Sequence, residues 1–371
     1  MKIAFLAPRY HSNQISLIQF LLKSKNKVSF YVTRVGKSED HSSLKPAIIR
    51  LSYITKVIKF FIKSNNVLFD YFYGMPSIKE LLKFKSNRYD LIIIRDPINL
   101  MGFSYLLWAK LIGVKIIIYI QKEVYKKNSF KIKDIIEKIY IKIFNEQCIS
   151  PCLGNLKFKK LTDKITYLPF CLSVNSYEKK WFLNNTVNIL TIGKFVSRKK
   201  HLLLIRTLSM LKVKNNFQLT IIGECSTKEH LIYLKKVKME IKLRGLKVNI
   251  LTNIKPKVVK NLYKKHDLFV LPSVKEPASV SNLEAMAYGL PVITTDTNQT
   301  SCYTEHGVNG FIVKSNNIEN LNKKLELLIN NKNKLKKFGN KSFGIVKKKY
   351  NTKLIYGQFF KKYQIFRNGS F

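Results

Sequence analysis

Two glutamates separated by seven residues form the pattern best suited to chemistry in this 371-residue chain. Glu276 follows a predicted strand at residues 268–271, and Glu284 falls in the first turn of a helix expected to begin near Ser281. Loops at the carboxyl ends of parallel strands are where open α/β sheets bind ligands, and a helix N-terminus favours anions. The pattern therefore predicts a site for a phosphorylated ligand.

Each of these glutamates also has a plainer interpretation. Ser281 and Glu284 fit the S-x-x-E pattern of a capping box, in which the carboxylate accepts a hydrogen bond from a backbone amide at the helix start. Glu276 stands beside Pro277 and fits an ordinary loop acid. Spacing alone leaves both interpretations open.

A second pattern is a basic loop that follows the predicted strand 187–192. Gly193 lets the backbone approach a ligand, and Lys194 and Lys199 place two cations on the same loop. The loop is suited to clamp a diphosphate, but a solvated basic loop explains it nearly as well in a chain this basic.

Two other loops end predicted strands. Gly223 and Glu224 form a turn after one of them, which is unspecific by itself. The loop after the first strand lacks the GxGxxG pattern of dinucleotide-binding folds, which argues against NAD or FAD. The polar side chains of this loop include Arg9, His11 and Asn13.

Apolar segments with the features of buried strands alternate with segments of helical periodicity throughout the chain, as in parallel βαβ units. The predicted strands are residues 2–7, 28–32, 89–95, 114–120, 165–170, 187–192, 218–222, 247–251, 268–271 and 291–294, with a small hairpin before residue 313. The predicted helices are residues 15–22, 44–63, 129–144, 202–211, 228–244, 256–265 and 352–366, with one more that follows strand 89–95 through Trp108 and Gly113 and one that begins near Ser281.

This order predicts an α/β fold of two Rossmann-like, doubly wound domains that face a central cleft. We expect an N-terminal domain at residues 1–170, a linker at 171–186 and a C-terminal domain at 187–350. The remaining residues, 351–371, are expected to form a helix that packs back on the N-terminal domain.

Composition limits the class of protein. A hydrophobic content of 46% with 24% charged residues is typical of a folded globular chain. No signal peptide and no apolar run of the roughly 20 residues needed to cross a bilayer occur, so we expect a cytoplasmic protein. Five cysteines without a CxxC pair predict neither a zinc site nor a disulfide framework.

The formal net charge of +45 favours polyanionic partners, although we attribute about half of the excess to a coding bias toward lysine, asparagine and isoleucine. Two basic amphipathic segments, residues 44–63 and 129–144, bear on whether one of these polyanionic partners is a membrane. Each fits a helix that packs on a sheet and turns its lysines to solvent, and each fits a helix that binds an anionic membrane surface.

The string EPASVSNLEAMAYGLPVITTD resembles a hallmark of the retaining GT-B glycosyltransferases of group 1 (family GT4). In that family two glutamates form an E-x7-E motif. The string GKFVSRKKHLLLIRTL is similar to the family's G-R-x3-x-K-(G/N)-H pattern, and LTIIGE, HDLFVLPS and HGVNGFIV follow in the family's order. The resemblance covers about residues 187–313, and the N-terminal half resembles the family only in its architecture and first strand.

The resemblance implies a role for each matching residue. Lys194 and Lys199 would neutralise the diphosphate of a nucleotide-sugar, UDP- or GDP-linked, and Glu284 would bind the ribose hydroxyls. Glu276 would contact the sugar or support the reacting centre. Backbone amides would bind the sugar and the β-phosphate at three positions: Ala278, Ser279 and Val280. The resemblance also implies that the chain transfers a hexosyl or related sugar to a glycan or lipid-linked acceptor. The transfer would retain the configuration of the sugar and would need neither a metal ion nor another cofactor.

Several positions depart from the family. Ala278 and Ser279 replace Phe-Gly, and Asn298 and Gln299 replace Gly-Gly. Gln121 stands where many relatives have a histidine near the sugar. The acceptor or sugar side would therefore be formed by four polar residues: Arg9, His11, Asn13 and Gln121.

Two other functions stay open. A catalytically inactive GT-B scaffold would account for the departures in the donor loops. A basic nucleic-acid-binding protein is suggested by charge alone, but the chain lacks any recognition motif and its aromatic residues fall in periodic apolar runs. We therefore expect no nucleic-acid partner.

Overall fold

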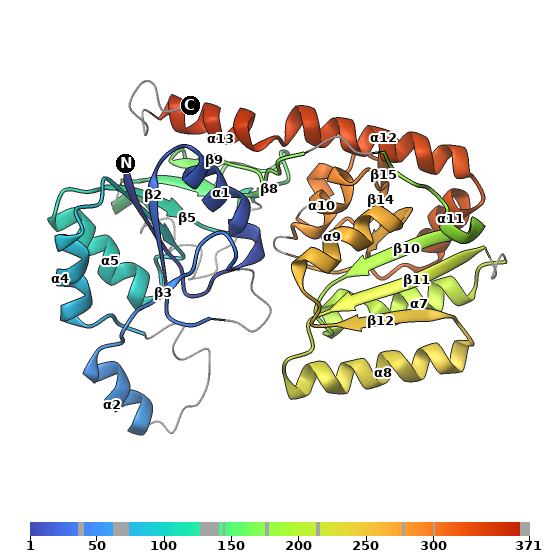
Figure 1. Ribbon diagram of the computed structural model, residues 1–371, viewed down its shortest axis with the longest axis horizontal. Coiled ribbons are helices and arrows are strands. Elements are labelled where there is room, and N and C mark those ends of the chain that lie inside the picture. The colour runs from blue at the N-terminus through green and yellow to red at the C-terminus, as the bar shows by residue number, and fades with distance from the viewer. Residues whose placement is uncertain are drawn as a thin grey trace. The chain divides into compact units, whose positions relative to one another are not determined.

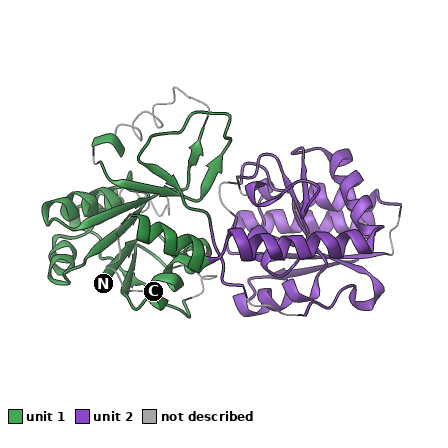
Figure 2. Cartoon of the chain, turned by 90° about the horizontal axis from the view of Figure 1, so that it is seen from above, with its two compact units in different colours: residues 1–169, 352–371 green, residues 170–351 purple. Residues whose placement is uncertain are grey.

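The computed structural model describes residues 1–35, 41–61, 74–126, 141–143, 145–174, 178–212, 216–276, 279–299 and 301–363. The chain divides into two compact units (Figure 2). Unit 1 comprises residues 1–169 and 352–371, and unit 2 comprises residues 170–351. The segment expected as a linker is counted with unit 2, where Trp181 and Phe182 pack against the hydrophobic core.

Unit 1 is built on a parallel sheet with the strand order β3-β2-β1-β4-β5-β7-β9 (Figure 1). Its strands are β1 (Lys2–Leu6), β2 (Lys27–Val32), β3 (Ala47–Ile48), β4 (Leu91–Arg95), β5 (Lys115–Tyr119), β7 (Gln147–Ser150) and β9 (Ile165–Tyr167). Two short strands, β6 (Glu123–Tyr125) and β8 (Cys152–Gly154), pair separately. The central strands are apolar on both faces because helices cover both.

The helices of unit 1 are α1 (Ser12–Lys23), α2 (Tyr53–Phe61), α4 (Ile78–Ser86), α5 (Leu100–Leu111) and α13 (Thr352–Lys362). The side chains of Ser77 and Asn99 cap α4 and α5 by accepting hydrogen bonds from the backbone. The C-terminal helix α13 packs on α1, where the ring of Phe20 lies 5.6 Å from Tyr356 and 5.9 Å from Phe360.

The first basic amphipathic segment differs from the long helix predicted for residues 44–63. A short strand, β3, precedes the nine-residue helix α2. The apolar side chains do not pack on a sheet, because Ile54 is 63% exposed and Phe61 is 78% exposed. The interpretation as a helix that packs on a sheet and turns its lysines to solvent is therefore wrong for this segment. The second segment, 129–144, lies outside the described residues except for 141–143.

Unit 2 is built on a second parallel sheet, with the order β12-β11-β10-β13-β14-β15 (Figure 1). Its strands are β10 (Val187–Ile192), β11 (Phe217–Gly223), β12 (Val248–Thr252), β13 (Leu268–Leu271), β14 (Val292–Thr295) and β15 (Gly310–Val313). The last strand was predicted to belong to a small hairpin. It instead pairs in parallel with β14 and extends the sheet.

The helices of unit 2 are α7 (His201–Ser209), α8 (Lys228–Arg244), α9 (Pro256–Lys265), α10 (Ser281–Ala287), α11 (Ile318–Ile329) and α12 (Lys332–Lys349). Short 3-10 turns occur at η1 (Leu183–Asn185), η2 (Ser197–Lys199) and η3 (Ser301–Tyr303). One hydrophobic core includes residues of α7, α8 and α11, and a second includes residues of α9, α10 and α12. The sheet is thus covered on both faces, as expected for a doubly wound fold.

Both sheets have one point where the strand order reverses. In unit 1 the chain leaves β1 toward β2 and returns to the other side of β1 as β4. In unit 2 it leaves β10 toward β11 and returns as β13. Ligands of doubly wound folds bind outside the carboxyl ends of the strands at such a switch point. The topology therefore gives the chain two candidate ligand sites, one at the carboxyl edge of β1 and β4 and one at that of β10 and β13.

Candidate functional site

Two cations share one carboxylate oxygen at the switch point of unit 2. Arg198 Nη1 lies 2.5 Å and Lys199 Nζ lies 2.6 Å from Glu276 Oε2. Glu276 is only 4% exposed, so the pair of cations stabilises a charge that burial would otherwise penalise. The sequence predicted Lys199 and Glu276 but missed Arg198, whose only signal was its place in the basic run before His201.

Backbone hydrogen bonds fix the loops that carry this cluster. The amide of Val274 donates to the carbonyl of Arg198 at 3.0 Å, and the amide of Gln299 donates to the carbonyl of Glu276 at 3.0 Å. The turn η2 ends at Lys200, which has a φ of 55°. The related motif has Gly or Asn at this position, and these residues favour that left-handed conformation.

Two glycines permit the close packing of these loops. A Cβ atom at Gly193 would lie 2.8 Å from Lys199 Cδ, so a side chain there would displace the lysine. A Cβ atom at Gly223 would lie 2.5 Å from the carbonyl oxygen of Gly193 and 2.6 Å from the ring of Phe195. Both predicted glycines are thus required by close approach at the carboxyl ends of β10 and β11.

The second predicted lysine belongs to a separate ion pair. Lys194 Nζ lies 3.0 Å from Glu224 Oε2, and the lysine side chain is 43% exposed. Glu224 also accepts a hydrogen bond from the hydroxyl of Ser226 at 2.7 Å. An exposed pair of this kind contributes little to stability, so Lys194 can exchange its carboxylate for another anion at low cost.

Burial sets the electrostatics of the lysine within the cluster. Desolvation lowers the pKa of Lys199, and the Glu276 carboxylate opposes that shift. Behind the cluster, burial lowers the pKa of His201 to about 3, so this imidazole is neutral at physiological pH. Its ring lies 5.2 Å from that of Phe195. His201 therefore adds packing but no positive charge.

Glu284 does not form the capping box that its spacing allowed. The N-cap of α10 is Val280, and no side chain caps the helix. Glu284 Oε2 instead accepts a hydrogen bond from the hydroxyl of Tyr263 at 2.9 Å. Although the residue as a whole is only partly buried, desolvation of its carboxylate raises the pKa, and the bond from Tyr263 opposes that rise.

The loop before α10 carries the other predicted donor-binding positions. The hydroxyls of Ser279 and Ser281 lie 2.7 Å apart, and Ser279 is buried. Val280 is the N-cap residue, while Ala278 lies outside the described residues. Tyr263, which the sequence did not single out, stacks on Tyr288 with ring centroids 5.5 Å apart. No feature of the sequence distinguished this tyrosine from other apolar positions of α9.

The residues predicted for the acceptor side fall in two places of unit 1. Three lie between β1 and the first turn of α1: Arg9, His11 and Asn13. Gln121 follows β5, and its Oε1 accepts a hydrogen bond from Arg95 Nη2 at 3.0 Å. Arg95, at the end of β4, is 8% exposed and was missed because it closes a run of aliphatic residues.

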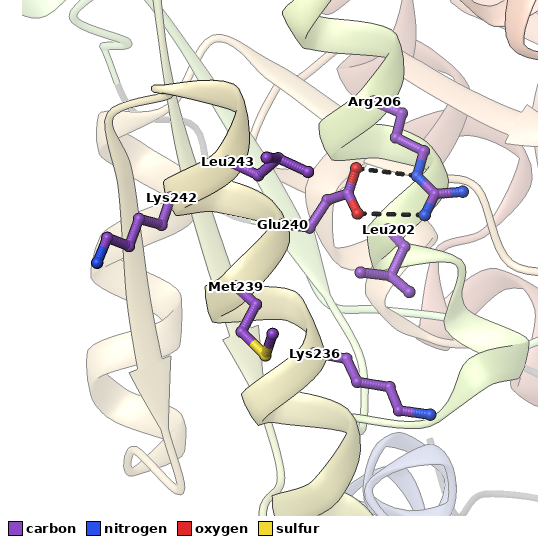
Figure 3. A pocket seen from close by; sticks show the side chains of 7 residues that line it. All are labelled: Leu202, Arg206, Lys236, Met239, Glu240, Lys242 and Leu243. Atoms are coloured by element: carbon purple, nitrogen blue, oxygen red, sulfur yellow. Dashed lines mark hydrogen bonds and ion pairs between the residues drawn. The ribbon is translucent and has the colours of Figure 1, made fainter.

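A surface groove of unit 2 contains none of the predicted site residues. It lies between α7 and α8 and is lined by Leu202, Arg206, Lys236, Met239, Glu240, Lys242 and Leu243 (Figure 3). Arg206 forms a two-pronged pair with Glu240, with contacts of 3.0 and 3.1 Å. This exposed arginine is a useful control for those of the two switch points.

Within the described part of the chain, no three His, Cys, Asp or Glu side chains gather in an arrangement that would bind a metal ion. None of the described helices has both the length and the apolar character required to cross a membrane.

Comparison with known proteins shows which family the sequence of unit 2 matches. Residues 175–343 match the family described as Glycosyl transferases group 1. An uncharacterized glycosyltransferase of Methanocaldococcus jannaschii is 32% identical over 133 residues, which cover 36% of this chain and 33% of that protein. The Escherichia coli UDP-Gal:alpha-D-GlcNAc-diphosphoundecaprenol alpha-1,3-galactosyltransferase is 24% identical over 271 residues, covering 66% of this chain and 68% of that protein.

Solved structures extend the likeness to both units. HepE of Anabaena, solved in complex with UDP-glucose, aligns with a TM-score of 0.73 at 15% identity. The alignment covers 99% of this chain and 100% of that chain. The fold is therefore GT-B, as the sequence predicted, and the resemblance of the second unit to the group 1 glycosyltransferases is confirmed.

Proposed function

We propose that this chain, whose second unit matches the group 1 glycosyltransferases, transfers a hexosyl or related sugar from a nucleotide-sugar to a hydroxyl group with retention of configuration. The acceptor would be a cell-envelope glycan or a lipid-linked saccharide of the kind used for capsule or lipopolysaccharide. A UDP- or GDP-linked donor is proposed. The E. coli relative is named for UDP-Gal and a diphosphoundecaprenol acceptor, which supports the donor and acceptor classes.

The observation that carries this proposal is the cluster of cations at the carboxyl edge of β10 and β13. Arg198 and Lys199 converge on one carboxylate, and Lys194 lies on the same loop. A donor diphosphate brings at least two negative charges, which exceed the single charge of Glu276. Lys199 can therefore turn to the diphosphate while Arg198 continues to pair with Glu276.

In the reaction, the bond between the anomeric carbon and the diphosphate oxygen breaks, and negative charge grows on that oxygen. Fixed cations aimed at this charge stabilise the transition state without reorganising. The acceptor hydroxyl attacks from the face of the leaving group, and its proton passes to the departing phosphate. Lys194 and Lys199 supply the neutralising charge, so we propose that the reaction needs neither a metal ion nor another cofactor.

The two glutamates take different roles in this proposal. Glu284 binds the ribose hydroxyls through the carboxylate oxygens, and Tyr263 fixes the orientation of that carboxylate by its hydrogen bond. Glu276 holds the cations and faces the sugar. Neither is required as a general acid or base. The altered positions Ala278 and Ser279 adjoin Glu276, and we propose that they determine which sugar is accepted.

We further propose that the protein is cytoplasmic and binds the inner face of the membrane through α2. This helix exposes Phe60 by 79% and Phe61 by 78%, next to Lys56 and Lys59. Aromatic side chains flanked by lysines suit the boundary between headgroups and acyl chains of an anionic bilayer.

The membrane proposal is tested by pelleting the protein with liposomes that contain phosphatidylglycerol. Replacement of Phe60 and Phe61 by serine should abolish pelleting. The matched control replaces Met239 and Leu243, which are also exposed beside lysines on α8, and should pellet like the wild type. Equal pelleting of both double variants would remove α2 from the proposal without affecting the transferase.

The transferase proposal is tested by calorimetry with UDP, GDP and ADP, followed by a screen of donor hydrolysis, which needs no acceptor. We expect one nucleotide to bind, and the affinity to be lost in Lys199→Ala and Glu284→Ala. Arg206→Ala should bind like the wild type. Absence of binding to all three nucleotides would instead support an inactive scaffold.

A further inference from the structure

The switch point of unit 1 gathers buried nitrogen donors that have no hydrogen-bond partner. At this edge, within the part of the chain that the structure describes, unpaired buried nitrogens occur on Gln14, Arg95 and Asn99. All three residues are nearly inaccessible, with exposures of 1%, 8% and 3%, respectively. A buried donor without a partner lowers the stability of the folded protein, and a charged donor lowers it further. Natural proteins retain such groups where a ligand or a function compensates for the cost.

The topology brings these three side chains to one edge of the sheet. Arg95 ends β4, and Asn99 is the N-cap of the helix that follows. Gln14 lies in the first turn of α1, the helix that follows β1 in the chain. Strands β1 and β4 are neighbours in parallel register, with Leu6 opposite Ile94. The edge beyond these strands is where the strand order reverses and where a doubly wound unit binds its ligand.

The oxygen atoms of the two amides are already occupied, which fixes the direction of their donors. Gln14 Oε1 accepts the backbone N–H of His11 at 2.9 Å, and Asn99 Oδ1 accepts that of Gly102 at 2.7 Å. Neither amide can be flipped without losing its backbone bond, so each presents an unpaired NH2 group.

The guanidinium of Arg95 is only partly satisfied. Nε donates to Asp96 Oδ2 at 3.2 Å, and Nη2 donates to Gln121 Oε1 at 3.0 Å. Nη1 has no partner in the described residues. Three N–H groups around one strand edge require a ligand that accepts hydrogen bonds and does not need to donate them. A hydroxyl group both donates and accepts, whereas a carboxylate or phosphate only accepts.

We infer that the β1/β4 edge of unit 1 binds an anionic group, a carboxylate or a phosphate, carried by the sugar acceptor. The inference rests on the proposed transferase function in assigning the anion to an acceptor. Arg95 supplies the charged donor, and the amides of Gln14 and Asn99 complete the set. The buried acceptor Asn13 Oδ1, also unpaired, suits a hydroxyl next to the anion. The acceptor is thereby assigned to the acidic saccharides or to phosphate-linked carriers.

The experiment uses the full chain with UDP at saturation, so that the diphosphate site of unit 2 is filled before any anion is added. Calorimetry then measures the affinities for D-glucuronate and for glycerol 3-phosphate. Glucose and glycerol are the neutral counterparts. We expect one anion to bind at least tenfold more tightly than its neutral counterpart, and the anion that does so identifies the source of the charge.

Variants of the arginine decide whether the binding occurs at this edge. Arg95→Met should weaken the favoured anion at least tenfold, and Arg95→Lys should restore only part of the affinity because it lacks the planar fork. Arg206→Met, at an exposed arginine of unit 2, should change nothing. UDP affinity serves as the check on folding and should be equal in all variants.

The outcomes separate this inference from the proposed function. If neither anion outbinds its neutral counterpart, or if Arg95→Met retains the preference, the anion site is refuted even when UDP binds. A purely structural role for Arg95 would lower the melting temperature and leave the ratio of anion to neutral affinity unchanged, which also refutes it. If no nucleotide binds but the anion preference depends on Arg95, the site stands and the transferase proposal fails.

Discussion

The carboxyl edges of the two sheets have the same topology but manage their charged side chains differently. In unit 2 the charges are paired with one another, since Arg198 and Lys199 contact Glu276 and Lys194 contacts Glu224. A ligand that arrives at this edge must take over cations that already have partners. Binding there is an exchange of ion pairs.

In unit 1 the donors at the corresponding edge are paired only in part, since Arg95 contacts Asp96 through Nε and Gln121 through Nη2 but leaves Nη1 without a partner. Gln14, Arg95 and Asn99 each keep a buried nitrogen unpaired among the described residues. A ligand has nothing to displace and adds bonds that the free protein lacks. The difference teaches that one fold can prepare a binding edge in two ways, by internal counter-ions that are released or by donors whose cost the ligand offsets.

The strongest test of the paired edge is removal of its most buried cation, in Lys199→Met. We expect turnover of a donor sugar to fall by about 10²–10³-fold, because one fixed group that stabilises the leaving-group charge is lost. Donor hydrolysis under saturating nucleotide-sugar measures this directly. Arg206→Met, which removes an exposed paired arginine, should keep wild-type turnover. If Lys199→Met retained full turnover, the cations of unit 2 would be structural counter-ions only.

A smaller effect is expected from Glu284→Gln, which removes the negative charge of the carboxylate that is proposed to bind the ribose. UDP affinity should fall by about 10–100-fold, since a hydrogen bond to a charged group contributes about 1.5–3 kcal/mol. Calorimetry with UDP measures this loss.

The stability of the Glu284→Gln variant should rise, in contrast to its UDP affinity, which should fall. The pKa of Glu284 is raised in the folded state, so its ionised form is disfavoured there, and the cost grows as pH rises above the ordinary value of about 4.5. The Gln variant should therefore be more stable than the wild type at pH 7 and equal to it at pH 4, as urea unfolding would show. An equal loss of stability at both pH values would indicate a packing defect instead.

The sequence predicted the architecture well because parallel strands buried on both faces are continuous apolar runs. Helix α8 and strand β10 fall at the predicted residues, Lys228–Arg244 and Val187–Ile192. The prediction was wrong at β15, where a short glycine-bounded strand fits a hairpin or a sheet edge equally well and only its partner distinguishes them. A helix was correctly expected at α2, but its predicted packing on a sheet was wrong, because its apolar residues have helical spacing and yet are largely exposed.

The site was predictable where a residue type is scarce and unpredictable where it is common. Glu276 could be singled out because acids are few in this basic chain, whereas Arg198 is one of 67 lysines and arginines. That two of the three consecutive basic residues 198–200, Arg198 and Lys199, reach the carboxylate depends on the turn η2, which only the structure shows. Pairing across distant loops, as between Tyr263 and Glu284, leaves no local signal.

His201 extends the comparison, because within the described part of unit 2 its buried Nδ1 has no hydrogen-bond partner although it lies near the cations. Burial lowers its pKa to about 3 from 6.5, so the neutral ring contributes stability that is complete above pH 6.5 and is lost as the pH falls toward 3. The free energy of unfolding should fall by about 1.4 kcal/mol per pH unit in this window.

The variant His201→Phe keeps the aromatic volume and should remove this contribution to the slope. Urea unfolding of both proteins at pH 7, 6 and 5 measures it. Parallel pH profiles for the wild type and His201→Phe would show that the imidazole is not a buried neutral group.

The smallest effect is expected from Tyr263→Phe, which removes one neutral donor from the paired edge. The tyrosine hydroxyl donates to Glu284 at 2.9 Å and lowers the pKa of that carboxyl against the effect of burial. Loss of the bond should weaken UDP binding by about threefold to tenfold, in line with about 0.5–1.5 kcal/mol for one hydrogen bond. It should also shift the pH at which UDP affinity begins to fall to a higher value, because the carboxyl then protonates more readily.

Tyr105→Phe, at a buried tyrosine of unit 1, should change neither quantity. A pH profile of UDP binding that is the same in Tyr263→Phe and the wild type would mean that Glu284 is oriented by its helix alone, and that the unit 2 edge depends on its ion pairs without support from this hydroxyl.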